Sequence, residues 1–132
     1  MQTILVGIFF LLHGMVHLLY AGQSWRLFEL RPEMTWPDSS WAFSKLLGDP
    51  TARLLATVFL VLAALGLAAS GLGLILRADW WRSVAIGSTV FSSVLFLVMW
   101  NGKFQALADQ GGVGILIDIA ILILILIFKW PA

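Results

Sequence analysis

Two histidines one helical turn apart and a distant aspartate are the residues of this chain best suited to chemistry. His13 and His17 lie in the first apolar segment, and Asp118 lies in the last one. Residues four apart share one face of an α-helix, so both imidazoles would point to the same side. Ionisable groups are costly in hydrocarbon and often mark a site when they occur there. The sequence therefore predicts a polar site where these three side chains meet.

These residue types suit several kinds of site. Two imidazoles and a carboxylate can bind zinc or iron with one coordination position open, so His13, His17 and Asp118 form a candidate metal site. A haem could take one axial histidine, but two histidines on one helix face cannot ligate both sides of the same haem. An apolar pocket with a His–Asp pair at its polar end would instead suit a quinone or a lipid. A His–Asp hydrogen bond could also serve only to fix helix register. We expect a pocket for a quinone or lipid, and binding in preference to catalysis.

Four further residues are expected to line the same site: Tyr20, Arg53, Trp100 and Asn101. Tyr20 lies along much the same helix face as the histidines. Arg53 could pair with Asp118 or bind a lipid phosphate, although an arginine that snorkels to the interface is the simpler interpretation. Three serines of the third apolar segment are expected to bond to their own backbone or to pack against a neighbour: Ser88, Ser92 and Ser93.

The composition indicates that a bilayer surrounds this site. Of 132 residues, 61% are hydrophobic and 11% are charged, whereas a soluble domain carries about 25% charged residues. The net charge of +1 gives no argument for a nucleic-acid partner, and the absence of cysteine excludes disulfides and thiolate metal sites. The expected partners are membrane lipid and either a second copy of the chain or a larger membrane complex.

Four apolar segments approach the roughly 20 residues that a transmembrane helix needs. They cover residues 3–21, 50–76, 80–101 and 113–130. Backbone groups in lipid must be satisfied internally, and these segments lack the alternation of barrel strands, so we expect helices. Asp49 and Asp79 are the expected N-caps of the second and third helices. The first segment is expected to be a retained helix, since it lacks the basic start of a signal peptide.

Short links between the later segments predict an all-α, integral membrane, antiparallel four-helix bundle that forms one domain. Both termini would lie on one face and the connection 22–49 on the other. At 1.5 Å per residue, His17, Asp118 and His13 would lie about 6, 8 and 12 Å below the face of the long connection. If the first and last helices are neighbours, the carboxylate can reach a histidine.

The charges leave the orientation open to two interpretations. A raw count of basic residues would put the long connection inside, but its charges are balanced by acids. Arg77 and Arg82 form a dense, unbalanced basic cluster on the face of the termini. Because basic residues collect on the cytoplasmic side, we expect cytoplasmic termini and a bacterial inner membrane.

The long connection, residues 22–49, is rich in aromatic residues among charges. We expect it to lie on the membrane as an interfacial anchor, with a short helix over residues 39–47 that stops at Gly48. The alternative is a lid over a site between the helices. Gly7, Gly14 and Ala21 form a separate stripe of small residues, which predicts close approach of another helix.

The order of these features resembles the DoxX-like group of small bacterial four-helix membrane proteins. The matching pieces are GIFFLLHGMVHLL over Gly7–Leu19, the aromatic connection, ALGLAASGLGLIL over Ala64–Leu76, and the basic turn at Arg77. The resemblance implies an accessory or quinone-associated role, with the family's Gly–small–polar pattern falling on Gly14–His17. An acidic residue common in the family's second helix has no counterpart in this chain.

Two alternatives of other classes remain beside ligand binding. One is a purely structural or assembly subunit of a membrane complex, in which the His–Asp pair only holds helices together. The other is a dimeric proton-coupled transporter, because four helices rarely enclose a transport path by themselves.

Overall fold

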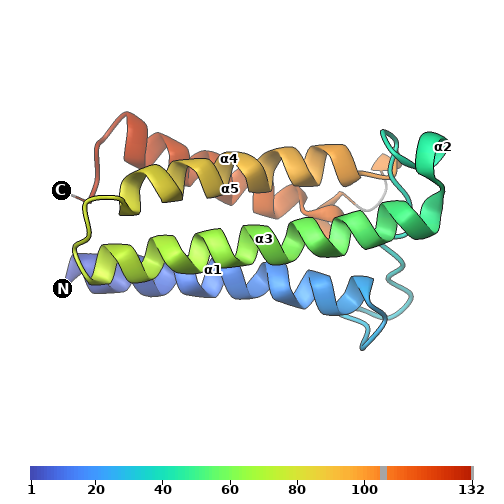
Figure 1. Ribbon diagram of the computed structural model, residues 1–132, viewed down its shortest axis with the longest axis horizontal. Coiled ribbons are helices and arrows are strands. Elements are labelled where there is room, and N and C mark those ends of the chain that lie inside the picture. The colour runs from blue at the N-terminus through green and yellow to red at the C-terminus, as the bar shows by residue number, and fades with distance from the viewer. Residues whose placement is uncertain (105–106, 132) are drawn as a thin grey trace.

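Long apolar runs form four long helices that lie side by side, with neighbours running in opposite directions (Figure 1). The computed structural model describes residues 1–104 and 107–131. Its elements are α1 (Gln2–Ser24), the short α2 (Ser44–Leu47), α3 (Asp49–Ile75), α4 (Trp81–Met99), a 3-10 turn η2 (Ala108–Gln110) and α5 (Gly112–Leu126). Met1 and Pro131 lie at one end, and the connection 25–48 and residues 100–104 and 107–111 lie at the other.

Among the residues that the structure describes, three helices are long and apolar enough to cross a membrane: α1, α3 and α4. The last helix is shorter than expected, because α5 ends at Leu126 and not near residue 130. Lys129 takes a positive φ of 51°, and the backbone N–H of Trp130 then donates to the carbonyl of Leu124 at 3.0 Å. The chain therefore folds back over the end of α5 instead of extending it.

The helix starts also differ from those expected. Asp49 is the first residue of α3 and Gly48 is its N-cap, while Trp80 and not Asp79 caps α4. The short helix α2 covers only Ser44–Leu47 and ends at Gly48, as expected. The break before α5 lies at Gly111, whose φ is 87° and whose Cβ position would meet the Phe96 ring at 2.1 Å. Only glycine satisfies both conditions.

Small residues bring α1 and α3 into close contact. A Cβ on Gly14 would lie 3.0 Å from the carbonyl oxygen of Ala64, and one on Gly71 would lie 2.5 Å from that of Gly7. The predicted close approach along the Gly7–Gly14 stripe is thus confirmed. Helix α3 packs in turn on α4, and α4 packs on α5.

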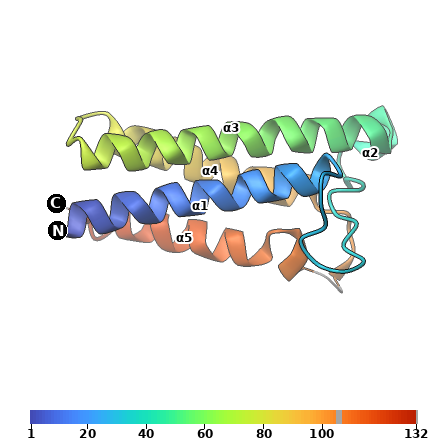
Figure 2. The same cartoon turned by 90° about the horizontal axis from the view of Figure 1, so that it is seen from below.

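The helices α1 and α5 close the ring of four, but less tightly. Figure 2 shows the two side by side, yet close backbone approach is concentrated in the other three helix pairs. Side chains of both helices project into the interval between α1 and α5. We call this interval the α1–α5 seam.

The aromatic connection caps the end of α4. The last carbonyls of a helix have no partner within it. Here Leu97 accepts from the indole N–H of Trp41 at 2.7 Å, Val98 from the Ser40 hydroxyl at 2.6 Å, and Met99 from the indole N–H of Trp36 at 2.9 Å. The backbone N–H of Trp41 also donates to the carbonyl of Trp100 at 2.9 Å. These bonds hold the connection firmly across this end of the bundle.

The aromatic residues of the connection differ in exposure. Trp25, Phe28 and Trp41 are exposed, and Trp36 is buried at 2% exposure. Both the interfacial anchor and the lid stay predictions for residues 22–49.

Candidate functional site

The predicted convergence of the first and last helices occurs at a buried His–Asp pair. Nε2 of His13 on α1 lies 2.8 Å from Oδ1 of Asp118 on α5. Asp118 is 0% exposed and His13 is 5% exposed. A carboxylate can only accept, so Nε2 of His13 carries the hydrogen. The pair spans the α1–α5 seam and compensates for burying the carboxylate.

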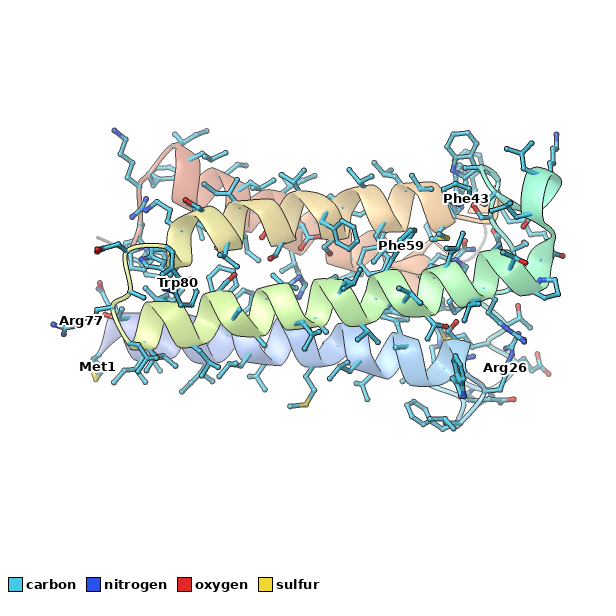
Figure 3. All side chains as sticks on the ribbon, in the orientation of Figure 1. Met1, Arg26, Phe43, Phe59, Arg77 and Trp80 are labelled. Carbon is cyan, nitrogen blue, oxygen red and sulfur yellow. The ribbon has the colours of Figure 1, made fainter. Side chains whose placement is uncertain are left out.

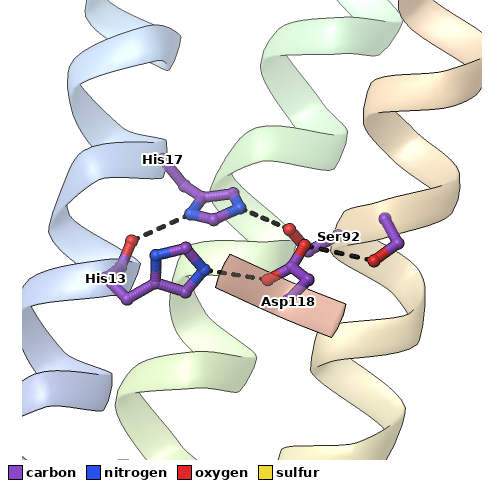
Figure 4. A network of polar contacts seen from close by, with 5 residues as sticks. His13, His17, Ser92 and Asp118 are labelled. Carbon is purple, nitrogen blue, oxygen red and sulfur yellow. Dashed lines mark hydrogen bonds and ion pairs between the residues drawn. The ribbon is translucent and has the colours of Figure 1, made fainter. Parts of the chain in front are cut away.

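His17 takes a different partner, a serine of α4. Its Nδ1 lies 2.9 Å from the backbone carbonyl of His13, one turn earlier on α1. Because a carbonyl only accepts, Nδ1–H must donate. In a neutral ring Nε2 then has only a lone pair, and it accepts from the hydroxyl of Ser92 at 2.7 Å (Figure 4). The ring is thus held in one tautomer.

A second serine reaches the same carboxylate. The Ser93 hydroxyl donates to Oδ2 of Asp118 at 3.3 Å, so both carboxylate oxygens accept a hydrogen bond. The cluster therefore joins α1, α4 and α5 at one level of the bundle. Hydrophobic side chains lie on either side of that level, with Leu60 and Phe96 toward the aromatic connection and Phe10 and Ile121 toward the termini.

One ring nitrogen in the cluster is open. Within residues 1–104 and 107–131, no group hydrogen-bonds to Nδ1 of His13, and Figure 4 shows it pointing away from Asp118. The ring of Phe9 stacks on that of His13, with centroids 6.0 Å apart and planes 4° apart. The edge of His17 meets His13 at 5.1 Å. Of the four ring nitrogens of His13 and His17, this is the one for which the described residues provide no hydrogen-bond partner.

An apolar cavity of about 310 Å³ lies in the α1–α5 seam on the terminal side of the cluster. Its walls are Leu5, Val6, Phe9 and Phe10 of α1 and Ile121, Leu124 and Ile125 of α5, and its floor is Trp130 and Pro131. Phe9 belongs to both the cavity wall and the stack on His13. The volume lies within the range of small-molecule pockets. The Phe9 ring therefore connects the cavity with the polar cluster.

A buried hydroxyl without a partner lies one turn from Ser93. Thr89 is 0% exposed, and among the described residues its Oγ1 has no hydrogen-bond partner. It lies four residues before Ser93 on α4, on the side toward the termini. Such groups cost free energy unless a small polar molecule or water satisfies them.

The remaining predicted site residues lie elsewhere. Tyr20 is half-buried and packs edge-on against Trp36 and Phe96, above the cluster. Arg53 does not pair with Asp118. The carbonyl of Arg53 bonds to Ser24, which is seven residues beyond His17 and therefore about 10 Å further along α1.

Trp100 and Asn101 also lie away from the pair, beyond the end of α4. The indole of Trp100 donates to the carbonyl of Lys103 at 2.9 Å, and the Asn101 side chain accepts from the backbone of Lys103 at 3.0 Å. Met99 ends α4 seven residues after Ser92, about 10 Å along the helix axis. These two residues belong to the connection that follows α4 and do not line the polar cluster.

The candidate metal site is not assembled. His13 faces Asp118, whereas both nitrogens of His17 are directed at other groups, so the three side chains do not converge on one point. In the part of the chain that the structure describes, no group of three or more His, Cys, Asp or Glu side chains is placed to hold a metal ion.

Sequence reasoning missed the two serines and Phe9. The sequence predicts that Ser92 and Ser93 bond to their own backbone or pack against a neighbour, but their hydroxyls bond to the side chains of His17 and Asp118. The signal that could have found them is depth, since both lie near the middle of the third apolar segment. The stack of Phe9 on His13 follows from their spacing of four residues, which places them on one helix face.

Comparison of this chain with protein-family models, with curated proteins and with solved structures found no match.

Proposed function

We propose that this chain is an integral membrane four-helix bundle in a bacterial inner membrane, with α1, α3, α4 and α5 all spanning and both termini in the cytoplasm. Three of these helices have the necessary length and hydropathy. Helix α5 has 15 residues and so measures about 22 Å, and it packs along α4, which is long enough to span. Arg77 lies at the end of the molecule that holds Met1 (Figure 3), as basic residues on the cytoplasmic side would.

Its role in this proposal is to bind a small apolar molecule that has one polar end. The observation that carries the proposal is the contact between an apolar cavity and a buried His–Asp pair with one open nitrogen, through Phe9. Pockets for small molecules combine mostly apolar walls with a few polar groups that fix orientation. A quinone or a lipid-like molecule has this combination.

The His–Asp pair can recognise either redox form of a quinone. With neutral His13, Nδ1 accepts a hydrogen bond from a hydroxyl of a quinol. With protonated His13, Nδ1–H donates to a quinone carbonyl, and the Asp118 carboxylate balances the charge. The pair can therefore stay hydrogen-bonded to the ligand when the ligand gains or loses a proton. The resemblance to DoxX-like proteins implies a quinone-associated role as well, and that resemblance stays a prediction.

Binding of decylubiquinone to the purified protein in detergent micelles tests the proposal. Quinones quench tryptophan fluorescence, and Trp130 lies in the cavity floor. We expect saturable quenching in the wild type and a dissociation constant about tenfold higher in His13→Ala, because one hydrogen bond to the ligand is lost. Leu12→Ala is the matched control, since Leu12 is on the same helix, exposed, and absent from the cavity wall.

Two other results would change the conclusion. If quenching does not saturate in the wild type, or His13→Ala binds as the wild type does, ligand binding at this site is wrong. If His13→Ala then lowers only the stability of the fold, the purely structural role is the better account. An optical spectrum of the same sample tests the haem alternative, because a bound haem produces a Soret band.

A further inference from the structure

The water-facing end of the bundle is closed above the polar cluster. Phe96 packs against His17 with ring centroids 5.3 Å apart, and Tyr20 and Trp36 pack against Phe96 at 5.9 and 6.0 Å. Trp36 is 2% exposed. A molecule coming from the water at this end would have to displace three aromatic rings that pack against one another before it reached a histidine.

The connection that carries Trp36 is also fastened at several points. Beyond its bonds to the last carbonyls of α4, Gln23 is 0% exposed and donates to the carbonyl of Met34 at 2.9 Å. The Gln23 side-chain oxygen accepts from the backbone N–H of Leu30 at 2.7 Å. Arg31 forms an ion pair with Asp109 in the neighbouring connection. Opening this end would break many of these bonds together.

The α1–α5 seam has the opposite character. It is the interval where two neighbouring helices approach least closely, and it contains the apolar cavity. Leu5, Phe9 and Leu124 line the cavity and are also 60%, 44% and 40% exposed. Their exposed surfaces lie on the sides of helices that would face acyl chains. Among the described hydrogen bonds, the one across the seam joins His13 to Asp118.

We propose that the ligand reaches His13 sideways from the bilayer, through the α1–α5 seam and past the ring of Phe9. This inference rests on the proposed function and narrows its substrate class. The ligand is a molecule dissolved in the hydrocarbon of the membrane, with a single apolar chain that lies along the cavity and a carbonyl or hydroxyl group that bonds to Nδ1 of His13. Water-soluble molecules are not its substrates.

Phe9 is the residue that controls this route. Its ring lies parallel to that of His13, with the centroids 6.0 Å apart, and it also lines the cavity. Because Phe9 is 44% exposed, its ring can shift to let a ligand pass without unpacking the core. The hydrogen bonds that fasten the aromatic connection at the other end of the bundle can stay intact while the Phe9 ring moves.

Two chemical tethers distinguish the sideways route from a route through the connection. The chain has no cysteine, so pairs of cysteines can be introduced without background. Leu5→Cys with Leu124→Cys places a thiol on each wall of the α1–α5 seam, and Arg31→Cys with Asp109→Cys places a pair across the two connections. Each pair is joined in detergent by a flexible bis-maleimide, and the protein is then reconstituted in phosphatidylcholine vesicles.

The measurement is the rate at which decylubiquinone quenches tryptophan fluorescence after rapid mixing. We expect the tether across the seam to slow quenching about tenfold and the tether across the connections to leave it unchanged. Each pair capped with N-ethylmaleimide, and so not joined, is the matched control. Phe9→Ala should speed the association, because it removes a large ring from the lining of the cavity through which the ligand passes.

The outcomes separate the route from the function itself. The sideways route would be wrong if the tether across the connections slowed quenching and the tether across the seam had no effect. In that case saturable binding would still support the proposed function. Equal slowing by both tethers would also overturn the sideways route. Absence of saturable binding in every variant, the capped controls included, would overturn the proposed function.

Discussion

The imidazole of His17 shows how neighbouring groups decide what a histidine can do. A backbone carbonyl one turn away imposes the Nδ1–H tautomer, and the Ser92 hydroxyl then occupies Nε2. Both ring nitrogens of His17 thus have a partner, although His17 is as buried as His13. His13 differs because its Nε2 is taken by Asp118 while Nδ1 stays open. Of the two histidines on this helix face, only His13 has a ring nitrogen left to bind a ligand.

The two serines should differ in their effect on stability. Ser92→Ala removes the donor to a fully buried nitrogen, and we expect it to lower the free energy of unfolding by about 1 kcal/mol. Ser93→Ala should cost less, because its bond to Asp118 is longer, at 3.3 Å compared with 2.7 Å. Reversible unfolding in mixed micelles with increasing dodecyl sulfate, followed by circular dichroism, measures both. An equal loss in the two variants would contradict the assignment of His17 Nε2 as the acceptor.

Among the elements, the unequal spacing of the helices decides where a ligand fits. Glycines allow the backbones of α1 and α3 to approach closely, and this interface has little room for anything else. Large side chains such as Phe9 and Ile121 lie between α1 and α5, and a cavity remains between them. The polar pair is connected to that cavity through Phe9, which lines the cavity and packs against His13 on the same helix.

A pair of glycine substitutions tests the close interface. Gly71→Ala places a methyl group 2.5 Å from the carbonyl oxygen of Gly7, so we expect a clear loss of stability as α1 and α3 are forced apart. Gly87→Ala is the control, since a Cβ there meets nothing within 4 Å. It should be neutral or should stabilise by up to about 1 kcal/mol, the helix preference of alanine over glycine. The thermal unfolding midpoint in detergent measures both variants. A Gly71→Ala protein as stable as Gly87→Ala would show that the helices do not pack this closely.

Across the whole molecule, the two ends have different tasks. At one end the aromatic connection caps α4 and covers the interior. At the other end Arg82 donates to the carbonyls of Ile125 and Pro131 at 3.3 and 3.0 Å and so closes α5. Arg26 and Arg77 lie at opposite ends (Figure 3), but the excess of basic over acidic residues is at the end of the termini.

That asymmetry predicts the orientation. We expect green fluorescent protein fused after Ala132 to fluoresce in cells, and alkaline phosphatase fused there to be inactive, because the C-terminus would be cytoplasmic. Replacing both Arg77 and Arg82 with glutamine should raise the alkaline phosphatase signal, whereas Lys103→Gln, at the other end, should not. A high phosphatase signal from the unsubstituted chain would reverse the proposed topology.

Much of the candidate site follows from one-dimensional information. The spacing of His13 and His17 places them on one helix face, and counting residues from the helix ends places Asp118 at nearly the same depth. The expected depth match is confirmed by the hydrogen bond between His13 and Asp118. Counting could not place Arg53 or Asn101 correctly, because their distance from the pair depends on how the connections fold.

By itself, the sequence determined the helical class, the number of long apolar segments and the small-residue stripe, because hydrophobic runs and glycine spacing act within one helix or on its nearest neighbour. Only the tertiary structure decided which histidine pairs with Asp118, that two serines complete the cluster, and that a cavity opens between α1 and α5. These features depend on the rotation of each helix about its own axis and on the distance between helices. Both quantities result from side-chain packing summed over the whole bundle, and no single segment encodes them.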